Sequence, residues 1–254
     1  MHRVDYNQRL HKRFHEGRVH DASVMDHWGQ VALRCVGTSS QTVLDLGSGT
    51  GRFSGVLSNA LDATVIGVEP SHKMRQVAQS ELTHPDVRFV AGSADAIPLH
   101  SGSCDVAWLS QIVHHLIDLP AVAAELRRVL APGGKVLIRN NFKGRLAEFS
   151  RFYEFFPSCL SVDEARHPSV DRVRDTLEAR GLRLRALETI EQREAGSLAE
   201  YAKRIRLRTY SSFELISESE YEQGLKTLLL AAESETTPEP VMAKVDLLVF
   251  DREA

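Results

Sequence analysis

Short apolar runs alternate with helically patterned stretches along most of this chain. The runs are rich in β-branched residues, as expected of parallel strands that are buried on both faces. They occupy residues 42–46, 64–69, 87–90, 104–110 and 135–139. The stretches between them place apolar residues three or four positions apart, which is the spacing of an amphipathic helix. This alternation predicts an α/β fold with a doubly wound, Rossmann-like sheet.

The ends of the chain extend this pattern. Residues 182–187 alternate as a half-exposed sixth strand, and residues 245–250 form a final strand after a stretch rich in helix breakers. The helix that begins at Leu119 is expected to stop at Pro132-Gly133-Gly134. The organisation we expect is an N-terminal helical cap (1–40), a cofactor-binding core (41–141), an aromatic-rich lid (142–167), the remainder of the core sheet (168–191 and 241–254) and a helical insertion on the probable substrate side (192–240).

Composition places the chain among ordinary globular proteins. Its 254 residues are 43% hydrophobic and 26% charged, with a formal net charge of -3. This charge argues against a nucleic-acid partner, since phosphate binding usually leaves a basic footprint. Cys35, Cys104 and Cys159 are few and scattered, which predicts no disulfide framework and a reducing, cytoplasmic location. We also expect no signal peptide and no membrane span, because no apolar stretch is long enough.

The first apolar run ends in a glycine-rich turn, Gly47-Ser48-Gly49-Thr50-Gly51. From Arg52 the pattern becomes helical. A strand that breaks into glycines before a helix exposes backbone N–H groups at the helix N-terminus. Glycine is needed there because it has no Cβ to prevent a positive φ or the close approach of a ligand. Such a turn in an open α/β sheet is the usual place for a cofactor.

The identity of that cofactor depends on neighbouring residues. The dinucleotide fingerprint Gly-x-Gly-x-x-Gly requires glycine where this chain has Arg52. Asp45 precedes the turn, and an acid at this position repels a pyrophosphate but suits a cation. The turn alone does not decide between cofactor classes.

Two further acids follow predicted strands. Glu69 ends the second strand, where a carboxylate can accept both ribose hydroxyls of an adenosine. Its alternative role is to stabilise the start of the helix at Pro70 and Ser71. Asp95 follows the third strand and could accept the exocyclic amine of adenine, with Ile97 near the ring, or cap a helical turn.

Histidines and aromatic residues are the remaining candidates. His114 and His115 follow the fourth strand; as neighbours they are a poor metal pair, but one of them could be a base. His11 and His15 share a helical face that is either a solvated surface or part of a metal site, and we predict no metal. The aromatic stretch 149–156 either walls an apolar substrate pocket or packs in the core.

In order and spacing, residues 43–53, 65–69, 92–99, 105–115 and 126–138 resemble the class I S-adenosylmethionine-dependent methyltransferases. The similarity is to the ubiquinone/menaquinone-biosynthesis-like group (methyltransferase type 11). It implies strand order 3-2-1-4-5-7-6 with the last strand antiparallel, and S-adenosyl-L-methionine as cofactor. By this resemblance the cofactor contacts are Asp45, Gly47, Ser48, Gly49, Gly51, Glu69, Pro70, Ala94, Asp95, Ala96, Ser110 and Gln111.

The resemblance implies methyl transfer to an oxygen, nitrogen or carbon of a small-molecule acceptor by in-line displacement. His114 and His115 are the candidate bases, and the candidate acceptor contacts are Tyr6, His15, Phe142, Phe152 and Tyr153. A nucleic-acid or protein methyltransferase is an alternative, although residues 110–113 lack the Asn/Asp-Pro-Pro-aromatic signature of enzymes that methylate base amines. A third possibility is a protein on the same scaffold that binds S-adenosylmethionine without methylating.

Overall fold

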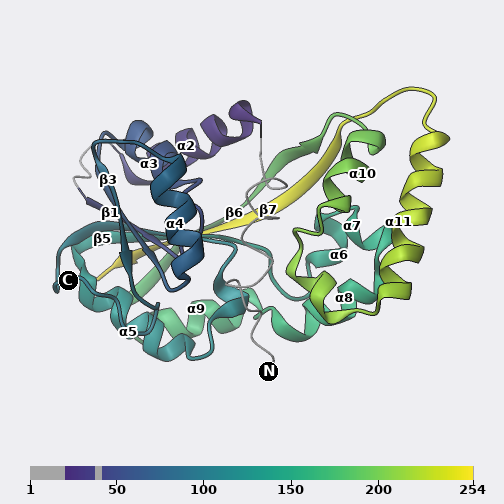
Figure 1. Ribbon diagram of the computed structural model, residues 1–254. Helices are drawn as coiled ribbons and strands as arrows, with labels where there is room; N and C mark the ends of the chain where they lie inside the picture. The colour runs from purple at the N-terminus through teal and green to yellow at the C-terminus, as the bar shows by residue number, and fades with distance from the viewer. Residues whose placement is uncertain (1–20, 38–41, 254) are drawn as a thin grey trace. The chain divides into compact units, whose positions relative to one another are not determined.

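The computed structural model describes residues 21–37 and 42–253, which divide into two compact units (Figure 1). Within the described ranges, the sheet unit comprises residues 21–140, 170–188 and 246–253. The helical unit comprises residues 141–169 and 189–245. Each unit is described by itself below.

A seven-stranded sheet has the order β3-β2-β1-β4-β5-β7-β6, as the sequence predicted. β1, β2, β3, β4 and β5 run parallel to their neighbours, whereas β7 pairs with β5 in the antiparallel direction. The strands are β1 (Thr42–Leu46), β2 (Thr64–Glu69), β3 (Val87–Ala91), β4 (Cys104–Ser110), β5 (Leu130–Asn140), β6 (Leu182–Ala195) and β7 (Val241–Arg252).

Helices cover both faces of this sheet, which makes it doubly wound (Figure 1). α2 packs against α3 on one face, and α5 packs against α9 on the other. The helices of the sheet unit are α2 (Ala22–Val36), α3 (Ser54–Leu61), α4 (His72–Glu81), the 3-10 helix η2 (Val113–His115), α5 (Leu119–Val129) and α9 (Val170–Glu178). Asp118 caps α5 by accepting a hydrogen bond from the Ala121 N–H at 2.9 Å.

The core of the sheet unit is built around aromatic rings. Trp108 of β4 is fully buried and contacts Trp28 of α2 edge to face, with ring centroids 6.2 Å apart. Phe53 lies 5.3 Å from the same ring. Such contacts add to the burial of large apolar surface, so the first strands and their flanking helices are held by one continuous core.

The junction between α5 and β5 differs from the prediction. The helix ends at Val129 and β5 begins at Leu130, so Pro132-Gly133-Gly134 lies inside the strand instead of terminating the helix. The pairing of β4 with β5 shifts register at this point. A Cβ on Gly134 would lie 2.9 Å from the Ala131 carbonyl oxygen and 3.0 Å from that of Asp105, so glycine allows this irregular entry into the strand.

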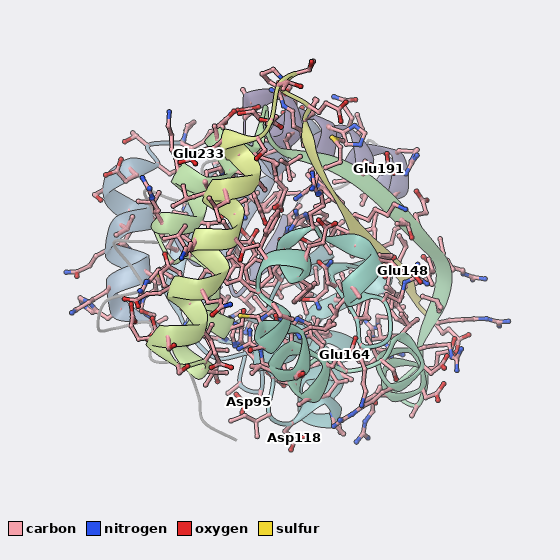
Figure 2. All side chains as sticks on the ribbon, turned by 90° about the vertical axis from the view of Figure 1, so that its right-hand side faces the viewer. Asp95, Asp118, Glu148, Glu164, Glu191 and Glu233 are labelled. Carbon is pink, nitrogen blue, oxygen red and sulfur yellow. The ribbon has the colours of Figure 1, made fainter. Side chains whose placement is uncertain are left out.

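The helical unit contains α6 (Leu146–Phe149), α7 (Phe152–Phe155), α8 (Pro157–Arg166), α10 (Leu198–Arg206), the 3-10 helix η3 (Ser211–Leu215) and α11 (Glu218–Glu233). α10 packs against α11, in the insertion where the sequence predicts two helices. A capping box between Ser217 and Glu220 starts α11. Exposed carboxylates, including those of Glu148, Glu191 and Glu233, lie on the outside of the unit (Figure 2).

Among the helices described, none is long and apolar enough to cross a membrane.

Candidate functional site

The glycine turn directly follows β1 and is tied to the end of β2. The Gly47 N–H donates to the Val68 carbonyl at 2.7 Å, and Gly47, Gly49 and Gly51 all have positive φ. A Cβ on Gly47 would lie 2.8 Å from Ile112, and one on Gly51 would lie 2.5 Å from the Phe89 ring. Among the residues that the structure describes, none has an atom within 4 Å of where a Cβ on Gly49 would be. Two of the glycines are therefore required by packing, whereas no described residue crowds Gly49.

Asp45 lies under this turn, at the end of β1. Its side chain is only 2% exposed and its Oδ2 accepts a hydrogen bond from the Ser54 hydroxyl at 2.6 Å. Burial raises the pKa of Asp45 to about 7, because a charged carboxylate is poorly solvated there, while the Ser54 bond acts in the opposite direction. α3 begins at Ser54, two residues later than the helix we predicted from Arg52, because residues 51–53 still form the turn. Sequence reasoning missed Ser54.

Glu69 connects the turn to the start of α4. Its Oε2 accepts the Gly49 N–H at 3.0 Å and its Oε1 accepts the Ser71 N–H at 2.8 Å. The helix cap itself is Ser71, whose hydroxyl accepts from the Met74 N–H at 3.3 Å. Glu69 is therefore both a neighbour of the α4 N-terminus and a carboxylate beside the glycine turn, and Pro70 is exposed next to it.

Asp95 lies in a tight turn and not at a helix terminus. Ser93 and Ala96 pair across this turn as an isolated bridge, and the Ala96 N–H donates to the Ser93 carbonyl at 3.2 Å. Ala94 and Asp95 are the turn residues, and the Asp95 side chain is exposed. The alternative in which Asp95 caps a helical turn is therefore wrong, since no helix follows it.

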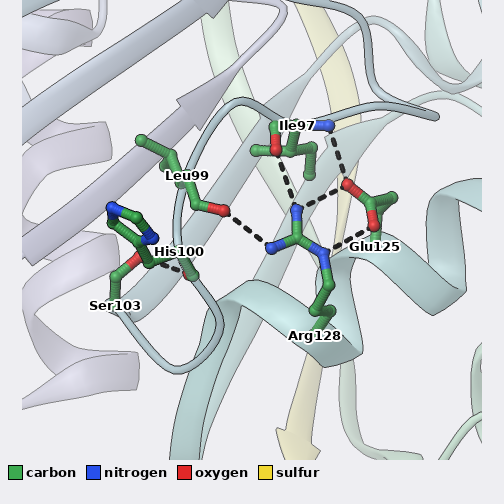
Figure 3. A network of polar contacts seen from close by, with 6 residues as sticks. All are labelled: Ile97, Leu99, His100, Ser103, Glu125 and Arg128. Carbon is green, nitrogen blue, oxygen red and sulfur yellow. Dashed lines mark hydrogen bonds and ion pairs between the residues drawn. The ribbon is translucent and has the colours of Figure 1, made fainter.

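The loop after this turn is held by two residues that sequence reasoning missed. Glu125 and Arg128 of α5 bind the main chain of Ile97 and Leu99 (Figure 3). The sequence signal for them is weak, because an acid and a base three residues apart on a helix usually form only a surface ion pair.

The segment after β4 contains the two candidate histidines, and the strand end is bonded to Arg139 of β5. Gln111 has a φ of 55°, and its N–H donates to the Arg139 carbonyl at 2.8 Å. The Arg139 guanidinium is buried between the Trp28 and Phe53 rings and donates to the Ser110 hydroxyl at 3.2 Å. The rings of His114 and His115 lie 4.1 Å apart, and both are partly buried. Arg139 is a further residue that we did not predict here.

The predicted cofactor contacts all belong to the sheet unit. They lie at or just after the ends of β1, β2, β3 and β4, which are adjacent parallel strands, so their carboxyl ends share one edge of the sheet. Ligands of open α/β sheets bind at this edge. Within the described residues, no cluster of three or more His, Cys, Asp or Glu side chains could hold a metal ion.

The predicted acceptor contacts belong to other parts of the chain. Phe142, Phe152 and Tyr153 are in the helical unit, while Tyr6 and His15 lie outside the described residues. Phe152 is 1% exposed and stacks on Tyr210 with ring centroids 4.4 Å apart. The Tyr153 hydroxyl donates to Asp163 at 3.0 Å. The roles of these residues toward an acceptor stay predictions.

Comparison with known proteins places this site in a family. Residues 44–138 match the model of the methyltransferase domain family. These residues of the sheet unit therefore match a methyltransferase domain, and the family resemblance seen in the sequence is confirmed.

Individual relatives and structures agree with this assignment. A 2-methyl-6-phytyl-1,4-hydroquinone methyltransferase of Synechocystis sp. is 32% identical over 177 residues, 67% of this chain and 54% of the relative. A malonyl-[acyl-carrier protein] O-methyltransferase of Marinomonas sp. is 29% identical over 58% of this chain and 57% of its own length. The chain thus spans little more than half of these two relatives.

A crystal structure from Anabaena variabilis shares the fold. It is described as a methyltransferase from an antibiotic biosynthesis pathway. It superposes with a TM-score of 0.70 at 23% identity, covering 88% of this chain and 96% of its own.

Proposed function

We propose that the protein transfers a methyl group from S-adenosyl-L-methionine to a small-molecule acceptor. The observation that carries this proposal is the set of three acids around a glycine turn at one edge of the sheet: Asp45, Glu69 and Asp95. Each acid follows a different strand, and together they match the amine and hydroxyl donors of a cationic nucleoside.

The residues present fit this cofactor. No atom of residues 21–37 or 42–253 lies within 4 Å of where a Cβ on Gly49 would be. The Ser48 hydroxyl oxygen is buried and, among the described residues, has no hydrogen-bond partner. A buried hydroxyl without a partner calls for an explanation, since unsatisfied polar atoms are rare in protein interiors, and a ligand bound at the glycine turn would supply one.

Each residue has a specific proposed role. Glu69 would accept the ribose hydroxyls, and Asp95, with Ala94 and Ala96, would recognise the adenine amine. Asp45, with the backbone of Gly47, Ser110 and Gln111, would face the amino-acid end. When bound, the cofactor supplies an electrophilic methyl group on a sulfonium. The chain contributes alignment, and well-oriented reactants can gain about 7–11 kcal/mol from proximity alone.

A small aromatic acceptor of the hydroquinone type is favoured because one of the two relatives described above has a name that specifies such a substrate. A hydroquinone offers a hydroxyl or an activated ring carbon as nucleophile, and removing its proton requires one base. His114 or His115 would supply that base, because the ordinary pKa of histidine lies near neutrality. The cysteines Cys35, Cys104 and Cys159 are all free, which fits the cytoplasmic location proposed for such an enzyme.

The test is a methyl-transfer assay with methyl-labelled S-adenosylmethionine and a prenylated hydroquinone. Transfer of label with release of S-adenosylhomocysteine supports the proposal. Calorimetry with S-adenosylmethionine, S-adenosylhomocysteine and NAD is the parallel measurement. If the folded protein binds neither sulfur nucleoside, the cofactor assignment is wrong.

The two alternatives give different results in the same assays. A protein that binds S-adenosylmethionine without methylating would produce binding heat but release no S-adenosylhomocysteine with any acceptor in a panel of phenols, amines and acids. A nucleic-acid or protein methyltransferase would transfer label to RNA, DNA or a protein extract and not to small molecules.

A further inference from the structure

One ion pair on α5 binds the main chain of the loop that follows β3. We call residues 93–99 the Asp95 loop, and Glu125 with Arg128 the clamp pair. Arg128 binds the Glu125 carboxylate in a bidentate manner, with Nε to Oε1 and Nη2 to Oε2 both at 2.7 Å. This fork geometry is the strongest that an arginine and a carboxylate can adopt.

The clamp pair also satisfies main-chain groups of the loop (Figure 3). Arg128 donates from Nη1 to the Leu99 carbonyl at 2.7 Å and from Nη2 to the Ile97 carbonyl at 2.8 Å. Glu125 Oε2 accepts the Ile97 N–H at 2.8 Å. The two side chains therefore supply the hydrogen bonds that a neighbouring strand would otherwise provide.

Asp95 lies between two fixed points of this loop. The bridge between Ser93 and Ala96 closes the turn around it, and the clamp pair holds Ile97 two residues further on. Ile97 is buried at 3% exposure, so its side chain anchors the same point in the core. The Asp95 carboxylate is exposed, yet its backbone is defined on both sides.

The charges of this region are also linked. Arg128 lowers the pKa of Glu125 through their hydrogen bonds, whereas the negative charge of Asp95 opposes that shift. Glu125 and Asp95 therefore repel each other, and Arg128 is the cation that compensates. Removing Arg128 would both release two carbonyls and leave the repulsion between the two carboxylates uncompensated.

We propose that Glu125 and Arg128 are positioning residues for adenine recognition: they hold the Asp95 loop so that Asp95 can accept the exocyclic amine of the cofactor. This inference rests on the proposed function, since it assumes an adenosine cofactor. Without the clamp pair, the loop would sample several conformations and would have to be ordered during binding. That ordering lowers affinity.

The experiment compares two ligands that differ in the edge of the base that carries the exocyclic amine, and the inosine analogue also has an N–H at N1 where adenine has an acceptor. S-adenosylhomocysteine carries the amine, and S-inosylhomocysteine has an oxygen there. Calorimetry on the full chain gives the ratio of their dissociation constants. We expect Arg128→Met to reduce this preference about tenfold, as loss of a charge-assisted hydrogen bond would. Affinity for the inosine analogue should change little.

Two further variants test the chemistry. Arg128→Lys should behave like Arg128→Met, because one ammonium group cannot reproduce the planar fork. Glu125→Gln should reduce the preference less, since its amide oxygen can still accept the Ile97 N–H. If Arg128→Met does not fold, as judged by circular dichroism, these two variants carry the test.

Lys135 and Asp251 provide matched controls. They form an ion pair of 2.7 Å in the same unit, and their side chains are 28% and 24% exposed, against 35% and 20% for Arg128 and Glu125. They join β5 to β7, away from the Asp95 loop. Lys135→Met and Asp251→Asn should leave the adenine preference unchanged.

Each result has a defined meaning. If wild type binds neither ligand, the proposed function fails. If wild type prefers the adenine ligand and both Arg128 variants keep that ratio, the positioning role is overturned. A loss of preference in Lys135→Met as large as that in Arg128→Met would also overturn it, because the effect would then reflect general stability.

Discussion

The Glu69 carboxylate and the Gly49 N–H are joined by a hydrogen bond of 3.0 Å between the end of β2 and the turn that follows β1. The second carboxylate oxygen accepts the Ser71 N–H, so one side chain links the turn to the first residue before α4. Each oxygen of an ionised carboxylate can accept more than one hydrogen bond. Glu69 can therefore hold the turn and still take part in binding a diol.

This geometry predicts the effect of Glu69→Gln. Glutamine has an NH2 group in place of one carboxylate oxygen. That group cannot accept a hydrogen bond from a backbone N–H or from a ribose hydroxyl. We expect the affinity for S-adenosylhomocysteine to fall about 10- to 100-fold, in line with the loss of hydrogen bonds to a charged group. Isothermal titration calorimetry measures this change.

The control for this variant is Glu81→Gln at the exposed end of α4. It removes one negative charge from the same unit without touching the turn, so its affinity should equal that of wild type. Equal affinity of Glu69→Gln and Glu81→Gln would exclude a ribose contact at Glu69.

Two glycines of the turn should respond differently to alanine. In Gly49→Ala the new methyl group meets no atom of the described part of the chain within 4 Å, so we expect only the positive φ to cost stability, about 1 kcal/mol. In Gly51→Ala the methyl group would lie 2.5 Å from the Phe89 ring, and overpacking adds about 1–3 kcal/mol. Urea unfolding should therefore show the larger loss for Gly51→Ala.

Gly49→Ala, the variant with the smaller loss of stability, should show a large effect on ligand binding. Gly49→Ala is expected to fold but to bind S-adenosylhomocysteine poorly, because its methyl group occupies the open space beside the turn. If Gly49→Ala binds as wild type does, the ligand does not approach the turn at Gly49.

The sequence predicted the sheet because buried parallel strands are continuous apolar runs, as in residues 42–46 and 104–110. It did not predict Ser54, Arg128 or Arg139 as parts of the site. Their contacts depend on which strands become neighbours and on where α3 begins, and neither follows from local spacing. Whether Asp95 accepts the adenine amine or caps a helical turn was undecided from the sequence, because a loop acid after a strand is compatible with both roles.

Asp45 should make stability depend on pH. Its pKa is raised by burial to about 7, so the folded state favours the protonated carboxyl. Its stabilising contribution is fully present below the ordinary pKa of an aspartate and is lost as pH rises through about 7. We expect Asp45→Asn, which stays neutral, to lack this loss.

The measurement is the free energy of unfolding by urea at pH 5 and pH 8. The free energy of unfolding of Asp45→Asn minus that of wild type should be larger at pH 8 than at pH 5, by a few kcal/mol. A difference that does not change between the two pH values would show that Asp45 keeps the same ionisation in the folded and unfolded states. The comparison cancels the contributions of other carboxylates, because both proteins share them.

His114 and His115 are distinguished by alanine substitution in the methyl-transfer assay at saturating cofactor. If one of them is the base, its loss should lower kcat about 10²- to 10⁴-fold, while the other variant changes it only slightly. In the affected variant, the rate should also no longer increase with pH in the range where histidine ordinarily titrates. The exposed His72, at the start of α4, gives the control variant His72→Ala. If neither His114→Ala nor His115→Ala differs from that control, neither of these two histidines removes the proton.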